Sequence, residues 1–361
     1  MNYLIVFLLS MAVSLFVVAT QSWHGRWTMD PITGIQKQHK LPTARVGGLA
    51  ILAGLIAAYV LVENNVQEMV GHLLLAGAPA FVFGLLEDLT KKISVTLRLF
   101  ATIASGVIAC YISGVSMQNT GVMPFDWLLS FPLVAILFTG FAVGGVANSI
   151  NIIDGFNGLA SGATAIMLAA IGLISLSVGD IDLATVCFLS VAIVLGFGVV
   201  NWPWGKLFLG DGGAYLAGFV LAWMSILLPM RNPDINAWAT LLICTYPVVE
   251  VAFSVRRRLK RGRGHSGRPD KVHLHHLIHR RIVRLWLPHQ SALVQNNMTS
   301  PICWLLTAMP AAWAFVFAKN TPMLVLGLAG IVFGYAAVYA RLSQFGWCLS
   351  PRTLHPTWRL S

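Results

Sequence analysis

Charged residues and cysteines are scarce in this sequence. Only 10% of its 361 residues are Asp, Glu, Lys or Arg, whereas about a quarter of the residues in a soluble domain are charged. The five cysteines are scattered, with no C-x-x-C pair, which argues against a disulfide framework or a zinc ribbon. No basic stretch precedes the first apolar run, so we interpret that run as a retained helix rather than a cleaved signal peptide.

Long apolar runs dominate the rest of the chain. Hydrophobic residues make up 57% of the sequence, and a helix that crosses a bilayer needs about 20 mainly apolar residues. Runs of this kind fall at residues 2–22, 46–63, 70–87, 94–114, 127–146, 159–178, 183–200, 212–230, 236–255, 299–318 and 321–340. We therefore predict an all-α, polytopic integral membrane protein with about eleven transmembrane helices.

Basic residues alternate between the two sides of these predicted helices. The loops after odd-numbered runs and the C-terminal segment hold 22 of the 24 Lys and Arg residues, and only Arg231 and Lys319 lie on the other side. Because cytoplasmic loops are enriched in Lys and Arg, the bias predicts a periplasmic N-terminus and a cytoplasmic C-terminus. We expect one transmembrane domain over residues 1–340, with cytoplasmic loops at 23–45, 88–98, 147–158, 201–211 and 256–298, and a cytoplasmic tail over residues 341–361.

The net charge of +11 has two interpretations. Basic proteins often bind nucleic acid, but basic loops of a membrane protein report its orientation and contact anionic headgroups or phosphorylated ligands. The apolar composition favours the second interpretation. We therefore expect the lipid bilayer as a partner and no nucleic acid.

Acidic and amide residues gather at the predicted cytoplasmic ends of the helices. The motifs are GLLEDLTKK, with Glu87 and Asp88; NSINIIDGFNGLA, with Asn148, Asn151, Asp154 and Asn157; NWPWGKLFLGDGG, with Asn201, Lys206, Phe208 and Asp211; and the basic segment that follows Glu250. Any one acid could simply reach water or pair with a nearby base. As a set on one face, they indicate a site for a phosphorylated ligand and Mg²⁺, which prefers one or two carboxylates plus substrate phosphates.

Two local motifs are ambiguous when taken alone. Asp211 is flanked by glycines where a predicted helix begins, which suits either phosphate contact with free backbone amides or a tight turn. His273, His275 and His276 could serve zinc binding, phosphate contact or a solvated basic loop. Zinc sites usually add Cys or a further acid at fixed spacing, so the surrounding Lys and Arg favour phosphate contact.

Five motifs in order carry a resemblance to a known family: HKLPTARVGG, LLEDLTKKIS, NSINIIDGFNGLA, NWPWGKLFLGDGG and PDKVHLHHL. They span about residues 39–279 and resemble those of the bacterial polyprenyl-phosphate N-acetylhexosamine-1-phosphate transferases, whose superfamily includes phospho-MurNAc-pentapeptide translocase. The resemblance implies an eleven-helix protein of the bacterial inner membrane whose active site faces the cytoplasm. It also implies Mg²⁺ as cofactor, with Mn²⁺ as a substitute, and a homodimer as a candidate assembly.

The resemblance further implies a reaction and the residues that perform it. Sugar 1-phosphate would pass from UDP-GlcNAc, or a related UDP-N-acetyl amino sugar, to undecaprenyl phosphate with release of UMP, initiating O-antigen or another envelope glycan. The catalytic candidates are Glu87, Asp88, Asp154 and Asp211, of which Asp211 and Asp88 would bind the metal. The substrate-binding candidates are Lys40, Arg45, Asn148, Asn151, Asn157, Asn201, Lys206, Phe208, Lys271, His273, His275 and His276.

Within this set, the resemblance suggests that Asn201 and Phe208 hold uracil, with the ring of Phe208 stacked on the base or serving only in packing. This sequence has Glu87 where the family usually has an Asp, and Asn157 where many members have one. Ala214 also replaces a Ser of the family pattern. These departures leave an inactive scaffold of the same family as an alternative.

A transporter of an anionic or lipid-linked solute is the rival from another class. It would place its polar residues near the bilayer midplane, whereas here they lie at one interface. The H-L-H-H spacing resembles the hexosamine transferases more than the MurNAc-pentapeptide enzyme.

Overall fold

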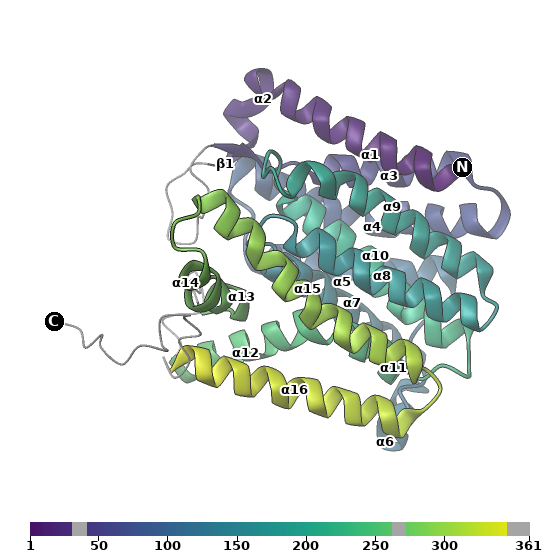
Figure 1. The fold of residues 1–361 in the computed structure, drawn as a ribbon. Coiled ribbons are helices and arrows are strands. Elements are labelled where there is room, and N and C mark those ends of the chain that lie inside the picture. The colour runs from purple at the N-terminus through teal and green to yellow at the C-terminus, as the bar shows by residue number, and fades with distance from the viewer. Residues whose placement is uncertain (31–41, 262–271, 345–361) are drawn as a thin grey trace.

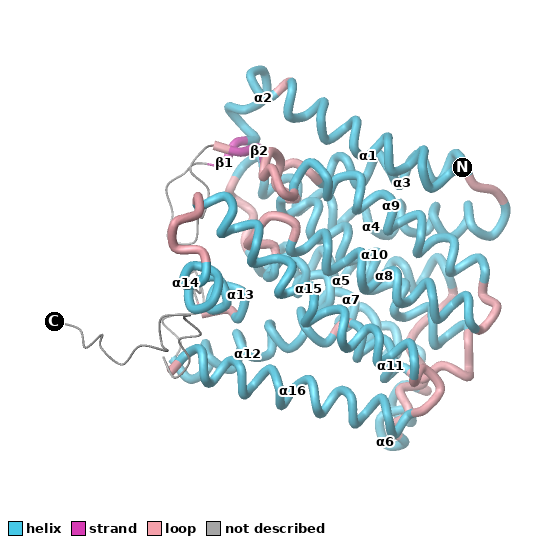
Figure 2. Tube along the Cα trace, in the orientation of Figure 1, coloured by secondary structure: helices cyan, strands magenta, loops and turns pink. Residues whose placement is uncertain are grey.

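The computed structural model describes residues 1–30, 42–261 and 272–344, and it is almost entirely helical (Figures 1 and 2). Within these ranges, nine helices are long and apolar enough to cross a membrane. A bent pair with an angle of 74° can form one further span, and Gly48–Leu61 is a shorter apolar helix. The all-α, polytopic prediction is therefore confirmed.

The long helices follow one another with short connections. They are α1 (Asn2–Ala19), α3 (Gly48–Leu61), α4 (Asn64–Thr90), α5 (Val95–Ser113), α7 (Pro132–Ile153), α8 (Leu159–Ser177), α9 (Ile181–Asn201), α10 (Gly210–Arg231), the bent pair α11 (Ala237–Ile243) and α12 (Thr245–Arg261), α15 (Ala292–Val316) and α16 (Thr321–Ser343). The short elements are α2 (Gln21–Thr28), β1 (Met29–Asp30), β2 (Thr43–Ala44), α6 (Met123–Leu129), α13 (Leu274–Ile278), η2 (His279–Val283) and α14 (Arg284–Trp286). Each of the eleven predicted runs overlaps one of the long helices.

Helix ends differ from the sequence-based boundaries where polar residues extend a helix. We expected a loop over 147–158, but α7 continues to Ile153 because nothing before Gly155 interrupts its hydrogen bonding. Likewise α4 continues to Thr90 and ends at Lys91 in the left-handed conformation. Asn148, Asn151 and Asp88 therefore stand on rigid helices rather than on loops.

The predicted loop over 256–298 is also partly helical. It contains the end of α12, the short helices α13 and α14, the π-helix η2 and the first turns of α15. Residues 262–271 lie outside the described part of the chain, as do residues 31–41 and 345–361, which include most of the predicted tail.

Helix α10 forms the centre of the bundle. Almost all of its residues are buried, and the helix packs against α3, α4, α7 and α8. Close packing at its N-terminus depends on glycine, because a Cβ on Gly84 of α4 would lie 2.7 Å from the backbone of Asp211 and Gly212. The first turn of α10 is therefore fixed on several sides.

The polar helix ends meet at one end of the bundle. Figure 1 shows α2, β1 and α13 at this end, and the N-terminus and α6 at the opposite end. A short two-stranded pairing joins Met29 to Ala44, and Ala44 also bridges to Leu207. These contacts hold Arg45 beside the start of α10.

Candidate active site

Asp88 links the end of α4 to the start of α10. Its side chain is fully buried, and its two carboxylate oxygens accept hydrogen bonds from the backbone amides of Asp211 (3.0 Å) and Gly212 (2.9 Å). The first amides of a helix have no partner within the helix and carry its positive dipole end, so a carboxylate there is stabilising. Asp88 thus fixes the position from which the Asp211 side chain projects.

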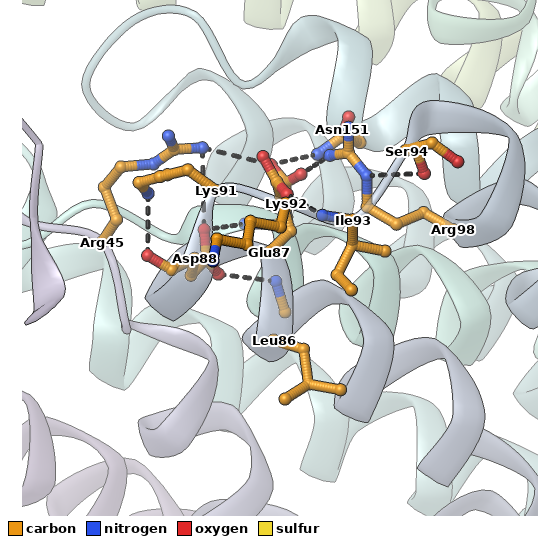
Figure 3. Close-up of polar contacts among 12 residues, drawn as sticks. Arg45, Leu86, Glu87, Asp88, Lys91, Lys92, Ile93, Ser94, Arg98 and Asn151 are labelled. Carbon is orange, nitrogen blue, oxygen red and sulfur yellow. Dashed lines mark hydrogen bonds and ion pairs between the residues drawn. The ribbon is translucent and has the colours of Figure 1, made fainter.

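The Asp211 carboxylate is the meeting point of side chains from three other segments. These side chains are Arg45, Arg98 and Asn151, which Figure 3 labels. Its Oδ1 accepts hydrogen bonds from Arg45 Nη2 (3.2 Å) and from Asn151 Nδ2 (3.0 Å) on α7. Its Oδ2 forms an ion pair with Arg98 Nη1 of α5. Two guanidinium groups and one amide therefore surround a nearly buried carboxylate.

Arg45 is shared by the two acids. Its Nη2 lies 3.2 Å from Asp211 Oδ1 and 3.6 Å from Asp88 Oδ1. One cationic group can therefore contact both carboxylates at once. The carboxylate oxygens of Asp88 and Asp211 are ligands that suit Mg²⁺, which is commonly held by one or two carboxylates plus substrate phosphates. Among the described residues, no group of three or more His, Cys, Asp or Glu is arranged to hold a metal.

Glu87 lies next to this cluster but faces the turn between α4 and α5. Its Oε2 accepts a hydrogen bond from the backbone amide of Ile93 (2.8 Å). Lys91 donates from Nζ to the backbone carbonyl of Asp88 (2.7 Å), and Figure 3 shows both residues around the end of α4. These two hydrogen bonds stabilise the turn between α4 and α5, next to Glu87 and Asp88.

Among the four acidic candidates, Asp154 differs in that its carboxylate makes no hydrogen bond or ion pair within the described residues. It follows the last turn of α7 and is half-buried. Removal from water raises the pKa of its carboxyl to about 7, while Arg45 lowers this pKa and Asp88 raises it further. A carboxylate in this position is available to a ligand, and it changes charge near neutral pH.

The histidines form a second cluster that packs against the Asp154 loop. His273, His275 and His276 are all buried, and the rings of His273 and His275 are parallel with centroids 5.3 Å apart. A Cβ on Gly155 would lie 3.4 Å from Nε2 of His275. Phe156 contacts the rings of His275 and His276, so the histidines lie directly beside the acidic motif.

His275 is neutral in this arrangement. Burial holds its pKa well below the usual value near 6.5, and the neighbouring His276 and His273 lower it further. Its Nδ1 is buried without a hydrogen-bond partner among the described residues. Buried polar atoms are normally paired, so this nitrogen is a candidate contact for a ligand.

Other predicted residues serve the packing around the site. Asn157 donates to the side chain of Asn297 (2.9 Å) and accepts at its carbonyl from Ser300. Asn201 accepts from the backbone amide of Gly158 and donates to the carbonyl of Leu207. Both asparagines are nearly buried and hold the loops on which neighbouring candidates stand.

The remaining candidates are placed as follows. Asn148 is half-buried on α7, one turn before Asn151. Phe208 is half-buried, and its backbone amide donates a hydrogen bond to the backbone carbonyl of Ala44 (2.8 Å). Lys206 is exposed, with Nζ 5.9 Å from the ring centroid of Trp204. Lys40 and Lys271 lie outside the described residues.

Two residues of this region were not among the sequence-based candidates. Arg98 lies at the end of the predicted cytoplasmic loop 88–98, and the structure places it in the first turns of α5, where it pairs with Asp211. Glu250 lies within the predicted apolar run 236–255, and its Oε1 is 2.9 Å from Nδ1 of His273. In both residues, the unusual position of a charge in an apolar segment was the available signal.

Comparison with known proteins places this site in a family context. Residues 69–229 match the sequence model of glycosyl transferase family 4. A Yersinia pestis protein named undecaprenyl-phosphate alpha-N-acetylglucosaminyl 1-phosphate transferase is 29% identical over 318 residues, which cover 86% of this chain and 84% of that protein. The protein of that name from Escherichia coli K12 is 29% identical, over 68% of this chain and 67% of its own length.

A more distant bacterial relative agrees with these two. A Bacillus subtilis protein named probable undecaprenyl-phosphate N-acetylglucosaminyl 1-phosphate transferase is 26% identical, over 72% of this chain and 71% of its own length. The matched segment 69–229 contains Asp88, Arg98, Asn151, Asp154 and Asp211. The chain, a polytopic membrane protein with these residues at one end of its helix bundle, matches glycosyl transferase family 4 over residues 69–229 and is similar over most of its length to proteins named undecaprenyl-phosphate N-acetylglucosaminyl 1-phosphate transferase.

Proposed function

We propose that this protein transfers an N-acetylhexosamine 1-phosphate from a UDP-sugar to undecaprenyl phosphate, forming undecaprenyl-pyrophosphoryl sugar and UMP. The relatives bear the name of this kind of transferase. The single structural observation that carries the proposal is the Asp211 carboxylate held by Arg45, Asn151 and Arg98. Such a group of one acid and two guanidinium groups suits a diphosphate accompanied by a divalent cation.

The reaction is a displacement at phosphorus. An oxygen of the lipid phosphate attacks the β-phosphorus of the UDP-sugar, and the bond from that phosphorus to the bridging oxygen breaks as UMP leaves. The lipid phosphate is ionised at its ordinary pKa, so a general base is dispensable. Arg45 and Arg98, which pair with Asp211, would bind phosphate oxygens and stabilise the charge on the leaving UMP.

Mg²⁺ fits the donors that the site presents. Asp211 and Asp88 would hold it, because Arg45 already shows that one positive group reaches both carboxylates. When bound, the metal would supply charge neutralisation at the diphosphate. Each carboxylate oxygen of Asp88 accepts one backbone hydrogen bond, and a carboxylate oxygen has room for a second contact.

The neighbouring groups would bind the rest of the donor. His275 and His276 lie beside the Asp154 loop, where they would contact the diphosphate or the sugar, with His273 next to them. The half-buried ring of Phe208 would stack on uracil, and Asn148 and Asn151 would line the same pocket. We place the protein in the bacterial inner membrane with this site facing the cytoplasm, where it would initiate O-antigen or another envelope glycan.

The test is release of UMP by the purified protein. Undecaprenyl phosphate and Mg²⁺ are supplied with UDP-GlcNAc, UDP-GalNAc or another UDP-N-acetyl amino sugar in turn. We expect UMP with one donor, and loss of UMP on chelation of the metal or in Asp211→Ala. Absence of UMP with every donor, from folded protein that binds no UDP-sugar, would overturn the proposal.

A further inference from the structure

Glu250 is a fully buried acid on α12, the second helix of the bent pair. We call residues 273–279, which hold four histidines, the histidine loop. Glu250 lies in an apolar run, where a carboxylate is costly unless it is paired or hydrogen-bonded. The neighbouring buried polar residue on this helix is Ser254, one turn later. A charge kept at such a position points to a specific partner.

Glu250 contacts the first two residues of the histidine loop. Both of its carboxylate oxygens lie 3.1 Å from the backbone amide of Leu274, which donates to them. Oε1 also lies 2.9 Å from Nδ1 of His273. One side chain therefore fixes the start of α13 and the ring of the residue before it.

This contact determines the orientation of more than one ring. With Nδ1 directed at the carboxylate, His273 cannot rotate freely, and its ring lies parallel to that of His275. His275 in turn lies 4.5 Å from His276, measured between ring centroids, and its Nε2 faces the backbone at Gly155. The set of rings is thus held against the loop that carries Asp154.

We propose that Glu250 is a positioning residue that orients the imidazoles of the histidine loop for the donor substrate. This inference rests on the proposed function, because it assigns a purpose to rings that would contact the diphosphate or sugar. Acids that orient metal-ligating histidines typically change metal affinity or activity about 10- to 100-fold when removed, and we expect a loss at the lower end of this range for Glu250. Glu250 itself does not touch the substrate.

The kinetic test is a double-mutant cycle on kcat/KM for UMP release. Glu250→Gln retains the shape of the side chain but loses its charge, and we expect it to lower kcat/KM about tenfold. His273→Ala should lower kcat/KM at least as much, and the double variant should match His273→Ala alone, because Glu250 acts through that ring. The proposal would be overturned if the losses of kcat/KM in the two single variants multiplied in the double variant, or if His273→Ala left kcat/KM unchanged.

A control separates positioning from general damage to α12. Ser254→Ala removes a buried hydroxyl from the same helix that has no hydrogen-bond partner among the described residues. We expect it to leave kcat/KM unchanged. Equal losses in Ser254→Ala and Glu250→Gln would contradict a specific role for Glu250.

Hydrogen exchange provides a readout that does not depend on activity. In Glu250→Gln, the amides of residues 272–283 should exchange faster than in the parent protein, whereas Ser254→Ala should not change them. If the parent protein makes no UMP with any donor, the proposed function fails, and this measurement decides the positioning inference alone. Unchanged exchange in Glu250→Gln would overturn it.

Discussion

Asp88 accepts the hydrogen bond of the Asp211 backbone amide, at 3.0 Å, while the Asp211 side chain points away into a group of basic residues. The two acids therefore have different tasks, although both stand at the same end of the bundle. Asp88 anchors the first turn of the central helix, and Asp211 presents its carboxylate to the ligand side. The distinction leads to separate predictions for stability and for activity.

Replacing Asp88 with Ala should reduce stability as well as activity. The variant leaves the amides of Asp211 and Gly212 without their acceptor, and an unpaired buried polar group costs about 1–3 kcal/mol. Thermal unfolding in detergent should therefore begin at a lower temperature. The control is Asp182→Asn at the opposite end of the bundle, where Asp182 accepts a hydrogen bond from the side chain of Asn65. An equal fall in both variants would contradict the anchoring role.

Replacing Arg98 with Gln should reduce kcat/KM about 10- to 100-fold, because it removes a charged partner of the Asp211 carboxylate that would stabilise the leaving phosphate. Arg98→Lys should retain part of the activity, since it keeps the charge but loses the planar fork. UMP release is the measurement. Arg231→Gln breaks a comparable pair with Asp180 far from the site and should leave kcat/KM unchanged; full activity in Arg98→Gln would exclude this role.

The stability of the ligand-free protein should depend on pH through Asp154. The folded-state pKa of about 7 lies above the unfolded value near 3.9, so the folded protein binds the proton more tightly. The stabilisation is present in full below the unfolded pKa and is lost as the pH rises through about 7. Arg45, Asp88, His275 and His276 surround the same region, and burial raises the pKa of Asp88 to about 6, so the comparison must be made against a variant.

Asp154→Asn supplies that comparison, because it cannot ionise and leaves the other groups in place. The thermal midpoint of the parent protein, measured relative to that of this variant, should decrease as the pH rises from 5 to 8. At pH 8 the variant should be the more stable protein. Measurements of both proteins over this range without substrate provide the test. A constant difference across the range would show that Asp154 titrates normally.

Gly210→Ala should prevent the first turn of α10 from forming correctly. Gly210 has a φ of +72°, and an added Cβ would clash with the carbonyl oxygen of Arg45 and lie 2.6 Å from Asp88 Oδ2. Both the left-handed conformation and the clash disfavour a side chain. Expression of folded protein, thermal midpoint and UMP release should all fall.

The control for Gly210 is Gly145→Ala on α7. A Cβ on Gly145 meets nothing within 4 Å, and Ala is favoured over Gly within a helix by about 0.5–1 kcal/mol. Gly145→Ala should therefore keep or raise the thermal midpoint. Tolerance of Ala at Gly210 would contradict the close approach of α4, Arg45 and α10 at the site.

The sequence predicted the helices well because hydropathy is a local property. Apolar runs are long, and lipid requires the backbone to satisfy its own hydrogen bonds, so each run becomes a helix. Boundaries failed where polar residues continue a helix, as in α7 through Asn151 to Ile153. The polar residues at the end of α7 therefore mark the candidate site and not the start of a loop.

The candidate site was predictable as a set of acids on one face, but not as a network. The contacts of Asp211 with Arg45 and Asn151 join residues separated by 166 and 60 positions, and no local pattern encodes such distances. For the same reason, the sequence does not reveal that Arg98 pairs with Asp211. Asn157 and Asn201, for which the family resemblance implies substrate contacts, also hold loops together in the structure.

The most direct test of the account follows the β-phosphate of the donor. The parent protein is supplied with undecaprenyl phosphate, Mg²⁺ and UDP-GlcNAc, or the donor found active, labelled with ³²P at the β-position. We predict that the label moves into the lipid product while unlabelled UMP is released, and that Asp211→Ala abolishes both. Label that stays in water-soluble UDP while sugar reaches the lipid would contradict transfer of a sugar phosphate.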